Sequence, residues 1–178
     1  DDVHVLGREQ LDEVFVPLDF APALLLGFGE ATLVPDNADA ALRCADVDSL
    51  IVAGLVFDAE RTSRRFVVLG DKKGKTSHAK SPSFLIDTVY RVGGTGKPGR
   101  TEVCLEINSN DVVVDHTWIW RADHGARTGW KSNTAKNGIV VNGDRVTCFG
   151  LFAEHFQEHD VLWNGEDGKT YFLQNEKC

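Results

Sequence analysis

The stretch that decides the fold of this 178-residue chain is Leu105-Glu-Ile-Asn-Ser-Asn-Asp-Val-Val-Val-Asp-His-Thr-Trp118. It holds a short apolar run, a corner of Asn, Ser and Asp, and a second apolar run. Valine and isoleucine favour strands, whereas Asn and Asp favour tight turns because their side chains bond to the nearby backbone. The stretch therefore predicts two strands that meet at a sharp corner.

The same pattern occurs in three other segments, residues 44–58, 140–154 and 162–176. The four corners begin at Asp48, Asn108, Asn142 and Asn164. The interval between the first two corners is the widest and has room for two copies, and a further copy fits at residues 83–92. The one helix that the sequence suggests is short, over residues 7–14.

A short repeat that carries strands and turns is typical of a β-solenoid, in which each coil covers the apolar face of the next. A β-sandwich also has regular strands, but it would not repeat the same corner in phase. We therefore predict an all-β fold, a single-stranded right-handed parallel β-helix like that of pectate lyases, as one domain over residues 1–178. The residues expected in its core are Leu50, Ile107, Val112, Val140 and Val146. Residues 70–80 and 93–100 are expected to be loops.

Charge and hydropathy exclude two classes of partner. The chain has 19 Lys and Arg against 27 Asp and Glu, a net charge of −8 that would repel a phosphate backbone, so we expect no nucleic-acid partner. Its longest purely apolar stretch is residues 23–26, far below the roughly 20 residues of a membrane helix, so we expect no membrane partner. The start at Asp1 and the lack of Met indicate a piece of a longer protein.

The cysteines and histidines do not form a metal-binding pattern. The chain has four cysteines and six histidines, with no CxxC pair and no zinc-type spacing. Cys44, Cys104 and Cys148 lie in alternating apolar segments, which favours small buried side chains over disulfides. His124 and His155 each follow a carboxylate but have no helical partner. We predict no metal site.

Three carboxylates, Asp123, Glu154 and Glu176, are expected at one position of successive coils, because their spacing matches whole coils. Adjacent strands lie about 4.8 Å apart, so stacked carboxylates repel one another unless one binds a proton. A carboxyl that keeps its proton is what a general acid requires. The alternative is a solvated acidic edge without chemistry.

Tryptophans are expected beside the same edge, where flat apolar rings suit a sugar ligand. They are Trp118, Trp120, Trp130 and Trp163. At least one of Trp118 and Trp120 is expected to belong to the core instead.

Three runs resemble the second β-helix of glycoside hydrolase family 55, the exo-β-1,3-glucanases that act on laminarin. They are Trp-Ile-Trp-Arg-Ala-Asp-His at 118–124, Gly-Leu-Phe-Ala-Glu-His at 150–155 and Tyr-Phe-Leu-Gln-Asn-Glu at 171–176. Family members show Trp-x-Trp-x-Ala-Asp-His, then Glu-His, then Gln-x-Glu. The resemblance extends from about residue 41 to the end of the chain.

The resemblance implies site residues and partners. Glu176 resembles the family's general acid, and Glu154 the carboxylate that helps to order the attacking water, with inversion at the anomeric carbon. The remaining candidates, for substrate binding, are Asp123, His124, His155, Trp120 and Trp163. The implied substrate is the polysaccharide β-1,3-glucan, with no cofactor and an extracellular, secreted location. Family members place the substrate pocket between two β-helices, so this chain would be one half, with a preceding β-helix of the same protein as its partner.

Two functions from different classes therefore remain open. The first is a β-1,3-glucan hydrolase, or its acid-bearing half, and the second is a non-catalytic β-solenoid that binds polysaccharide or acts as a scaffold. A pectate-type lyase is a third reading, for which Asp111, Asp115 and Arg121 are thin support. Inverting enzymes hold their carboxyls about 6.5–9.5 Å apart and retaining ones about 5–5.5 Å apart, so inversion requires Glu154 and Glu176 to diverge.

Overall fold

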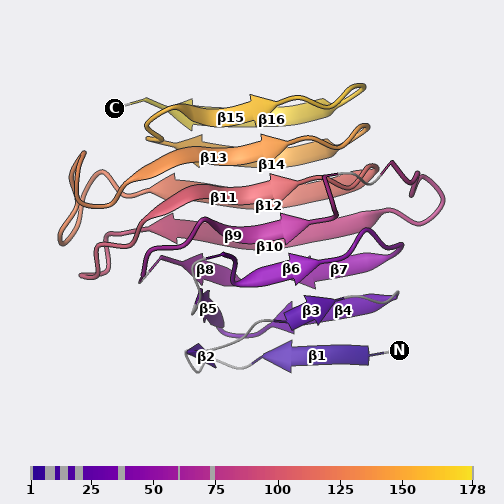
Figure 1. Cartoon of the computed structure of the whole chain (residues 1–178), viewed down its shortest axis with the longest axis horizontal. Helices are drawn as coiled ribbons and strands as arrows, with labels where there is room; N and C mark the ends of the chain where they lie inside the picture. Colours follow the sequence, from indigo (N-terminus) through magenta and orange to yellow (C-terminus); the bar gives the residue numbers. More distant parts are fainter. Residues whose placement is uncertain are drawn as a thin grey trace.

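The described residues form parallel strands that coil around one axis. The computed structural model describes residues 2–6, 11–12, 16–18, 22–35, 39–59, 61–72 and 75–177. These residues form sixteen strands in two sheets, and they contain no helix. In this part of the chain no helix is long and apolar enough to cross a membrane. Each strand pairs in parallel with a strand of a neighbouring coil (Figure 1).

The first sheet follows the order β1-β4-β7-β10-β12-β14-β16, with three short strands beside it. Its strands are β1 (Asp2–Leu6), β2 (Leu11–Asp12), β4 (Ala23–Gly27), β5 (Thr32–Val34), β7 (Leu50–Ala53), β8 (Val56–Asp58), β10 (Ser83–Val92), β12 (Val112–Arg121), β14 (Thr147–Glu154) and β16 (Lys169–Glu176). The second sheet has the order β15-β13-β11-β9-β6-β3. Its strands are β3 (Val16–Leu18), β6 (Leu42–Cys44), β9 (Arg65–Leu69), β11 (Thr101–Ile107), β13 (Ala135–Val141) and β15 (His159–Trp163).

Strand register marks where each coil ends and the next begins. One full coil separates the partners in each of the pairs Leu24↔Ile51, Ile51↔Phe84, Phe84↔Val113, Val113↔Thr147 and Thr147↔Lys169. The coil that begins at Val113 is the longest of these, and the one that begins at Thr147 is the shortest. The parallel β-helix is thus confirmed, and so is the further copy at 83–92, which is β10. Continued beyond the paired residues, the register places Asp48 in line with Asn110 and not with Asn108.

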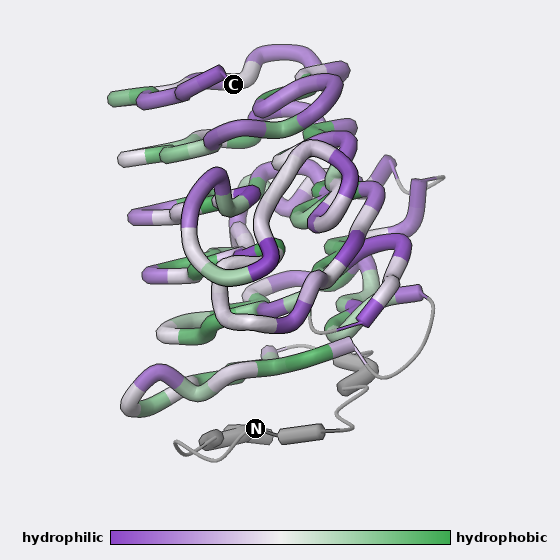
Figure 2. Tube along the Cα trace, turned by 90° about the vertical axis from the view of Figure 1, so that its left-hand side faces the viewer, coloured by the Kyte–Doolittle hydropathy of each residue, from purple (hydrophilic) through white to green (hydrophobic). Residues whose placement is uncertain are grey.

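The short helix predicted over residues 7–14 is wrong where it can be checked. Leu11–Asp12 form strand β2, which pairs with β5. The rest of that segment lies outside the described residues. The predicted loops 70–80 and 93–100 contain no strand in their described parts, and a longer loop, residues 122–134, connects β12 to β13. Figure 2 shows the coils as stacked layers with hydrophilic loops outside them.

The core is built from columns of apolar side chains, one from each coil. One column runs through the first sheet as Leu25, Val52, Leu85, Val114 and Cys148, all at most 1% exposed. Burial of each such side chain stabilises the fold by about 1.5–3 kcal/mol. The side chains of Cys44, Cys104 and Cys148 are buried and form no disulfide, as predicted, and burial raises the pKa of Cys148 to about 12.

Four of the five predicted core residues belong to this core, namely Leu50, Ile107, Val112 and Val146. Val140 is the exception. It is only 9% exposed, but it pairs with Glu106 and Leu162 on the outer face of the second sheet. Successive residues of a strand face opposite sides, so the inward positions of Ile139 and Val141 force Val140 outward.

The predicted Asn corners stack directly on one another. Asn142 Nδ2 donates to Asn108 Oδ1 at 2.7 Å, and Asn164 Nδ2 donates to Asn142 Oδ1 at 2.8 Å. Gly143 follows in the same corner, where a Cβ atom would lie 1.9 Å from the carbonyl oxygen of Ser109. The corner therefore requires glycine at this position because the coils approach too closely for a side chain.

Gly143→Ala is expected to destabilise the protein by more than Gly150→Ala, as measured by the free energy of unfolding in urea. At Gly150 a Cβ atom would make only ordinary van der Waals contacts, its nearest neighbour lying 3.8 Å away, so only the left-handed φ of 63° opposes alanine. That strain costs about 1–2 kcal/mol. At Gly143 the backbone of the neighbouring coil must move. Equal losses in the two variants would contradict the close approach at the corner.

Candidate active site

Glu154 and Glu176 are direct register partners at the carboxyl ends of β14 and β16. Their predicted stacking is therefore confirmed. The third residue of this row is Trp120, not Asp123. The prediction for Asp123 is wrong because β12 ends at Arg121, and the residues of the following loop do not keep the phase of the strand.

Asp123 nevertheless lies close to the carboxylate pair. Its Oδ1 is 3.6 Å from His155 Nε2, which in turn is 3.8 Å from Glu176 Oε2. His124 Nδ1 bonds to the same Asp123 oxygen at 2.7 Å. Burial by itself would raise the pKa of Asp123, but the bond from His124 and the nearby His155 outweigh it and lower the pKa. The structure thus brings Asp123, His124 and His155 together beside Glu176.

His155 is held in place by the backbone on both sides. It has a φ of 68° and is 8% exposed. Its N–H donates to the carbonyl of Glu176 at 2.7 Å, and its carbonyl accepts from Arg121 Nη1 at 2.9 Å. A non-glycine residue in the left-handed region persists only where its surroundings impose the conformation. The backbone of His155 is therefore held in this conformation, and its imidazole lies near the carboxylates of Asp123 and Glu176.

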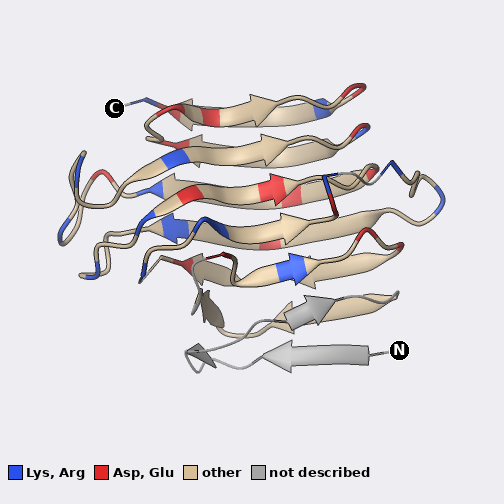
Figure 3. Ribbon diagram, in the orientation of Figure 1, with Lys and Arg blue, Asp and Glu red and all other residues tan. Residues whose placement is uncertain are grey.

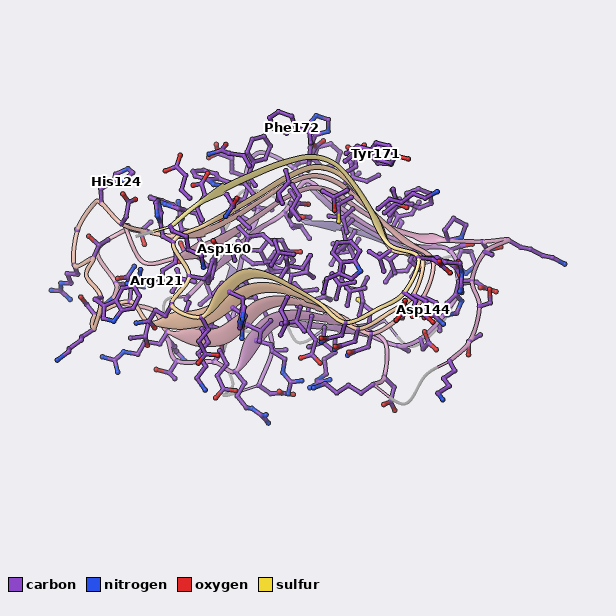
Figure 4. All side chains as sticks on the ribbon, turned by 90° about the horizontal axis from the view of Figure 1, so that it is seen from above. Arg121, His124, Asp144, Asp160, Tyr171 and Phe172 are labelled. Carbon is purple, nitrogen blue, oxygen red and sulfur yellow. The ribbon has the colours of Figure 1, made fainter. Side chains whose placement is uncertain are left out.

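Arg121 is buried and anchors the loop 122–134. Besides His155, its guanidinium donates to the carbonyls of Asn133 at 3.0 Å and Gly129 at 3.1 Å. Figure 4 places Arg121 and Asp144 at opposite ends of the coil. Asp111 lies at the Asp144 end, where it accepts from Arg145. Arg121 therefore does not serve the suggested lyase trio, whose members the structure does not bring together.

The two carboxylates differ in exposure and share one donor. Glu154 is 9% exposed, whereas the side chain of Glu176 is 58% exposed. Trp118 Nε1 donates to Glu154 Oε2 at 3.1 Å. Gln174 Nε2 donates to Glu154 Oε1 at 3.0 Å and to Glu176 Oε1 at 3.1 Å. Sequence reasoning assigned no role to Gln174, although its place two residues before Glu176 on one strand was a usable signal.

The tryptophans are distributed differently from expectation. Trp118 and Trp120 stack at 5.2 Å with an interplanar angle of 17°, and both lie on the outer face. The expectation that one of them is a core residue is wrong because residues two apart share a face, and Ile119 between them fills the core. Trp120 also contacts His124, with ring centroids 5.1 Å apart.

Of the other two tryptophans, Trp130 lies on a loop and Trp163 lies away from the carboxylates. Trp130 is 53% exposed on the loop 122–134, with Arg121 over its ring at 5.1 Å. Trp163 ends β15, packs partly buried against the core and adjoins Gly168. It therefore lies at the Asn corner, and the structure does not bring it to Glu176.

Comparison with known proteins identifies the family of the chain. A family model described as the LAM55 pectate lyase-like domain matches residues 16–176. The chain belongs to this family. The resemblance to the second β-helix of glycoside hydrolase family 55 is thereby confirmed.

The LAM55 domain is similar to a part of larger proteins. It is 47% identical, over 92% of its length, to an exo-beta-1,3-glucanase of Streptomyces sp. (strain SirexAA-E / ActE), and spans 27% of that protein. The structure of sacteLam55A from Streptomyces sp. SirexAA-E has a TM-score of 0.90 and 45% identity, covering 98% of this chain and 31% of that one. A variant of sacteLam55A in complex with glucose has a TM-score of 0.90, 44% identity and the same coverage.

An aromatic face continues from the site across β14 and β16 of the LAM55 domain. Phe149 and Tyr171 stack at 5.0 Å, and Phe152 contacts Phe172 at 5.6 Å. Tyr171 is 53% and Phe172 68% exposed, and Figure 4 shows both pointing away from the coil. Between Lys169 and Glu176, β16 carries no charged residue, and β14 carries none before Glu154. Figure 3 marks the charged residues, many of which lie in the loops at the ends of the coils. Exposed apolar patches of this kind mark interaction surfaces.

Trp118→Phe is expected to lower the free energy of unfolding by about 1–2 kcal/mol, because Glu154 loses an N–H donor while the ring that stacks on Trp120 is kept. Unfolding in urea, followed by far-UV circular dichroism, measures the loss. The matched control is Trp130→Phe at an exposed loop position, which is expected to stay within about 0.5 kcal/mol of the wild type. An equal loss in both variants would argue against a role for the Trp118–Glu154 bond.

Proposed function

We propose that this domain is the acid-bearing half of a hydrolase that cleaves β-1,3-glucan. The observation that carries the proposal is the pair Glu154 and Glu176, in register at one coil end beside the stacked rings of Trp118 and Trp120. Hydrolysis of a glycosidic bond uses two carboxyls in this way, and flat aromatic rings suit a sugar. The similarity to a protein named exo-beta-1,3-glucanase supports the choice of substrate.

In this proposal Glu176 donates the proton to the departing oxygen and Glu154 orders the attacking water. Glu176 is the more exposed of the two, so it can reach a substrate. Both oxygens of Glu154 accept hydrogen bonds, from Trp118 and from Gln174, which suits a residue that stays in place. Asp123, His124 and His155 flank Glu176 and are the proposed contacts to the sugar hydroxyls, together with Trp120.

Inversion of configuration is the finer part of the proposal, and it sets a geometric condition. Gln174 Nε2 donates to Oε1 of Glu154 at 3.0 Å and to Oε1 of Glu176 at 3.1 Å. The distance between these two oxygen atoms therefore cannot exceed the sum of the two bond lengths. An inverting pair holds its carboxyls about 6.5–9.5 Å apart, with water and sugar between them. The exposed Glu176 side chain must therefore swing away from Glu154 when the substrate enters.

The proposed partner is a preceding β-helix of the same protein, packed beside the aromatic face of β14 and β16. The LAM55 domain spans only 27% and 31% of its larger relatives, which leaves ample chain for such a partner. The exposed rings of Phe149, Tyr171 and Phe172 offer it an apolar surface. We also propose a secreted protein, because a polysaccharide substrate lies outside the cell that degrades it.

Glu176→Gln in the complete enzyme is expected to abolish turnover of β-1,3-glucan while sparing a β-glucoside whose leaving group needs no proton, because only acid assistance is lost. Glu154→Gln is expected to impair both substrates, since water must still be activated. Release of glucose and of the activated leaving group are the two measurements.

Equal losses on both substrates in Glu176→Gln would contradict the assignment of the acid. A product that first forms with the β configuration, observed by proton NMR, would contradict inversion. Wild-type activity in Glu176→Gln would remove the proposed hydrolase function from this site.

The second candidate function, binding of polysaccharide without catalysis, is favoured by the stacked and partly exposed rings of Trp118 and Trp120. Under either function, β-1,3-linked oligosaccharides are expected to quench tryptophan fluorescence, and Trp118→Phe combined with Trp120→Phe is expected to remove most of the change. Quenching together with an inactive wild-type complete protein would favour the binding function. No quenching at millimolar ligand would exclude sugar binding and leave a scaffold.

A further inference from the structure

We propose that Gln174 is a positioning residue whose side-chain amide joins Glu154 and Glu176 and thereby sets how the two carboxyls share protons. This inference rests on the proposed function, because it assigns a role beside the proposed acid and base. Gln174 itself forms no bond in the reaction. Its effect passes through the two carboxylates that its nitrogen contacts.

Gln174 uses both hydrogens of its side-chain amide as hydrogen-bond donors. An amide –NH₂ has two hydrogens, and Gln174 Nε2 has a carboxylate oxygen at 3.0 Å on one side and another at 3.1 Å on the other. The reverse orientation would point the amide oxygen at Glu154, which the proposed function keeps ionised and which can then only accept hydrogen bonds. The chemistry of the partners therefore fixes the orientation of this amide.

The strand register explains why a glutamine fits here. Gln174 lies two residues before Glu176 on β16, so both side chains leave the same face. Its register partner on β14 is Phe152, which lies two residues before Glu154. The amide therefore reaches Glu154 across a diagonal between adjacent strands, a distance that long side chains can bridge. Asparagine, which is one methylene shorter, would not reach both carboxylates.

The amide also offsets the electrostatic repulsion between Glu154 and Glu176. Two ionised carboxylates on adjacent parallel strands repel each other, which favours a proton on one of them, and a donor shared between them limits that effect. Other titratable groups face the pair: His155 after β14, with Asp123 and His124 on the loop 122–134. His155 lies on the Oε2 side of Glu176, with Asp123 next to His155 and His124 next to Asp123, whereas Gln174 lies between the two carboxylates.

The test compares Gln174→Met and Gln174→Glu with Gln157→Met in the complete enzyme. Methionine keeps the length of the side chain but removes the donor, and glutamate replaces the donor with a third acceptor. Gln157 is the matched control because its amide donates to the carbonyl of Trp130 and not to either carboxylate. The measurements are the pH dependence of kcat/KM for β-1,3-glucan and the carboxyl ¹³C titrations of Glu154 and Glu176 by NMR.

Both limbs of the pH–rate profile are expected to move to higher pH in Gln174→Met, by about 0.5–1 unit, because carboxylates that lose a donor bind protons more readily. The shift in Gln174→Glu is expected to be larger, and Gln157→Met is expected to keep the wild-type profile. The NMR titrations of the two carboxyls should move in the same direction.

A lower kcat/KM with unmoved limbs and unmoved carboxyl titrations would overturn the inference and leave Gln174 a structural residue. Equal shifts in Gln157→Met would overturn it as well. A wild-type enzyme that does not hydrolyse β-1,3-glucan would overturn the proposed function, and the NMR titrations alone would then decide whether Gln174 joins the two carboxyls.

Discussion

The parallel register between coils is the constraint on which the rest of the structure depends. Backbone bonds between β12, β14 and β16 place Trp120, Glu154 and Glu176 in one row. The same bonds place Trp118, Phe152 and Gln174 in the row before it. Because each coil returns to the same sheet, residues far apart in the sequence become neighbours at strand spacing. The candidate site is therefore an outcome of backbone pairing, with side chains added in rows.

Left-handed residues shape the sheet that carries the site. The column runs through five coils, as Gly54, Asp87, His116, Gly150 and Phe172, with φ between 49° and 66°. Each bends its strand at the same height, since the flanking residues pair in register. Asp87, His116 and Phe172 accept this conformation without being glycine, at a cost of about 1–2 kcal/mol each. Pairing on both sides of the bend imposes it.

Two features of the site oppose each other, and their balance bears on function. Backbone pairing draws Glu154 and Glu176 together, whereas catalysis with inversion needs them apart. Glu154 and Glu176 nevertheless differ in their burial and in their contacts. Glu154 is buried and held by Trp118, while Glu176 is exposed near His155. The surroundings thus distinguish two chemically identical groups, which is the condition that acid–base chemistry sets.

Much of the fold was predictable from local sequence. The Asn-Gly corners recur because each coil needs the same turn and the same close approach to its neighbouring coil. Asn142, Gly143 and Asn164 therefore predicted the stacking of the coils. Buried cysteines followed from alternation, and the pairing of Glu154 with Glu176 followed from a spacing of one whole coil. Val140 was misplaced because β13 ends in the apolar run Ile139-Val140-Val141, which has apolar residues on both faces and hides the alternation.

Only the tertiary structure decided the surroundings of the carboxylates. Asp123 and His124 lie on a loop, where no strand period applies, and their approach to His155 depends on the anchoring of that loop by Arg121. Trp163 lies at the Asn corner, away from Glu176, and the sequence does not reveal how far apart the course of the coil places these two residues. Gln174 contacts Glu176 on its own strand and Glu154 diagonally across on β14. The sequence by itself determined which residues repeat with the coils, because strand period and turn chemistry are local, whereas loop placement and side-chain contacts between coils depend on the packed whole.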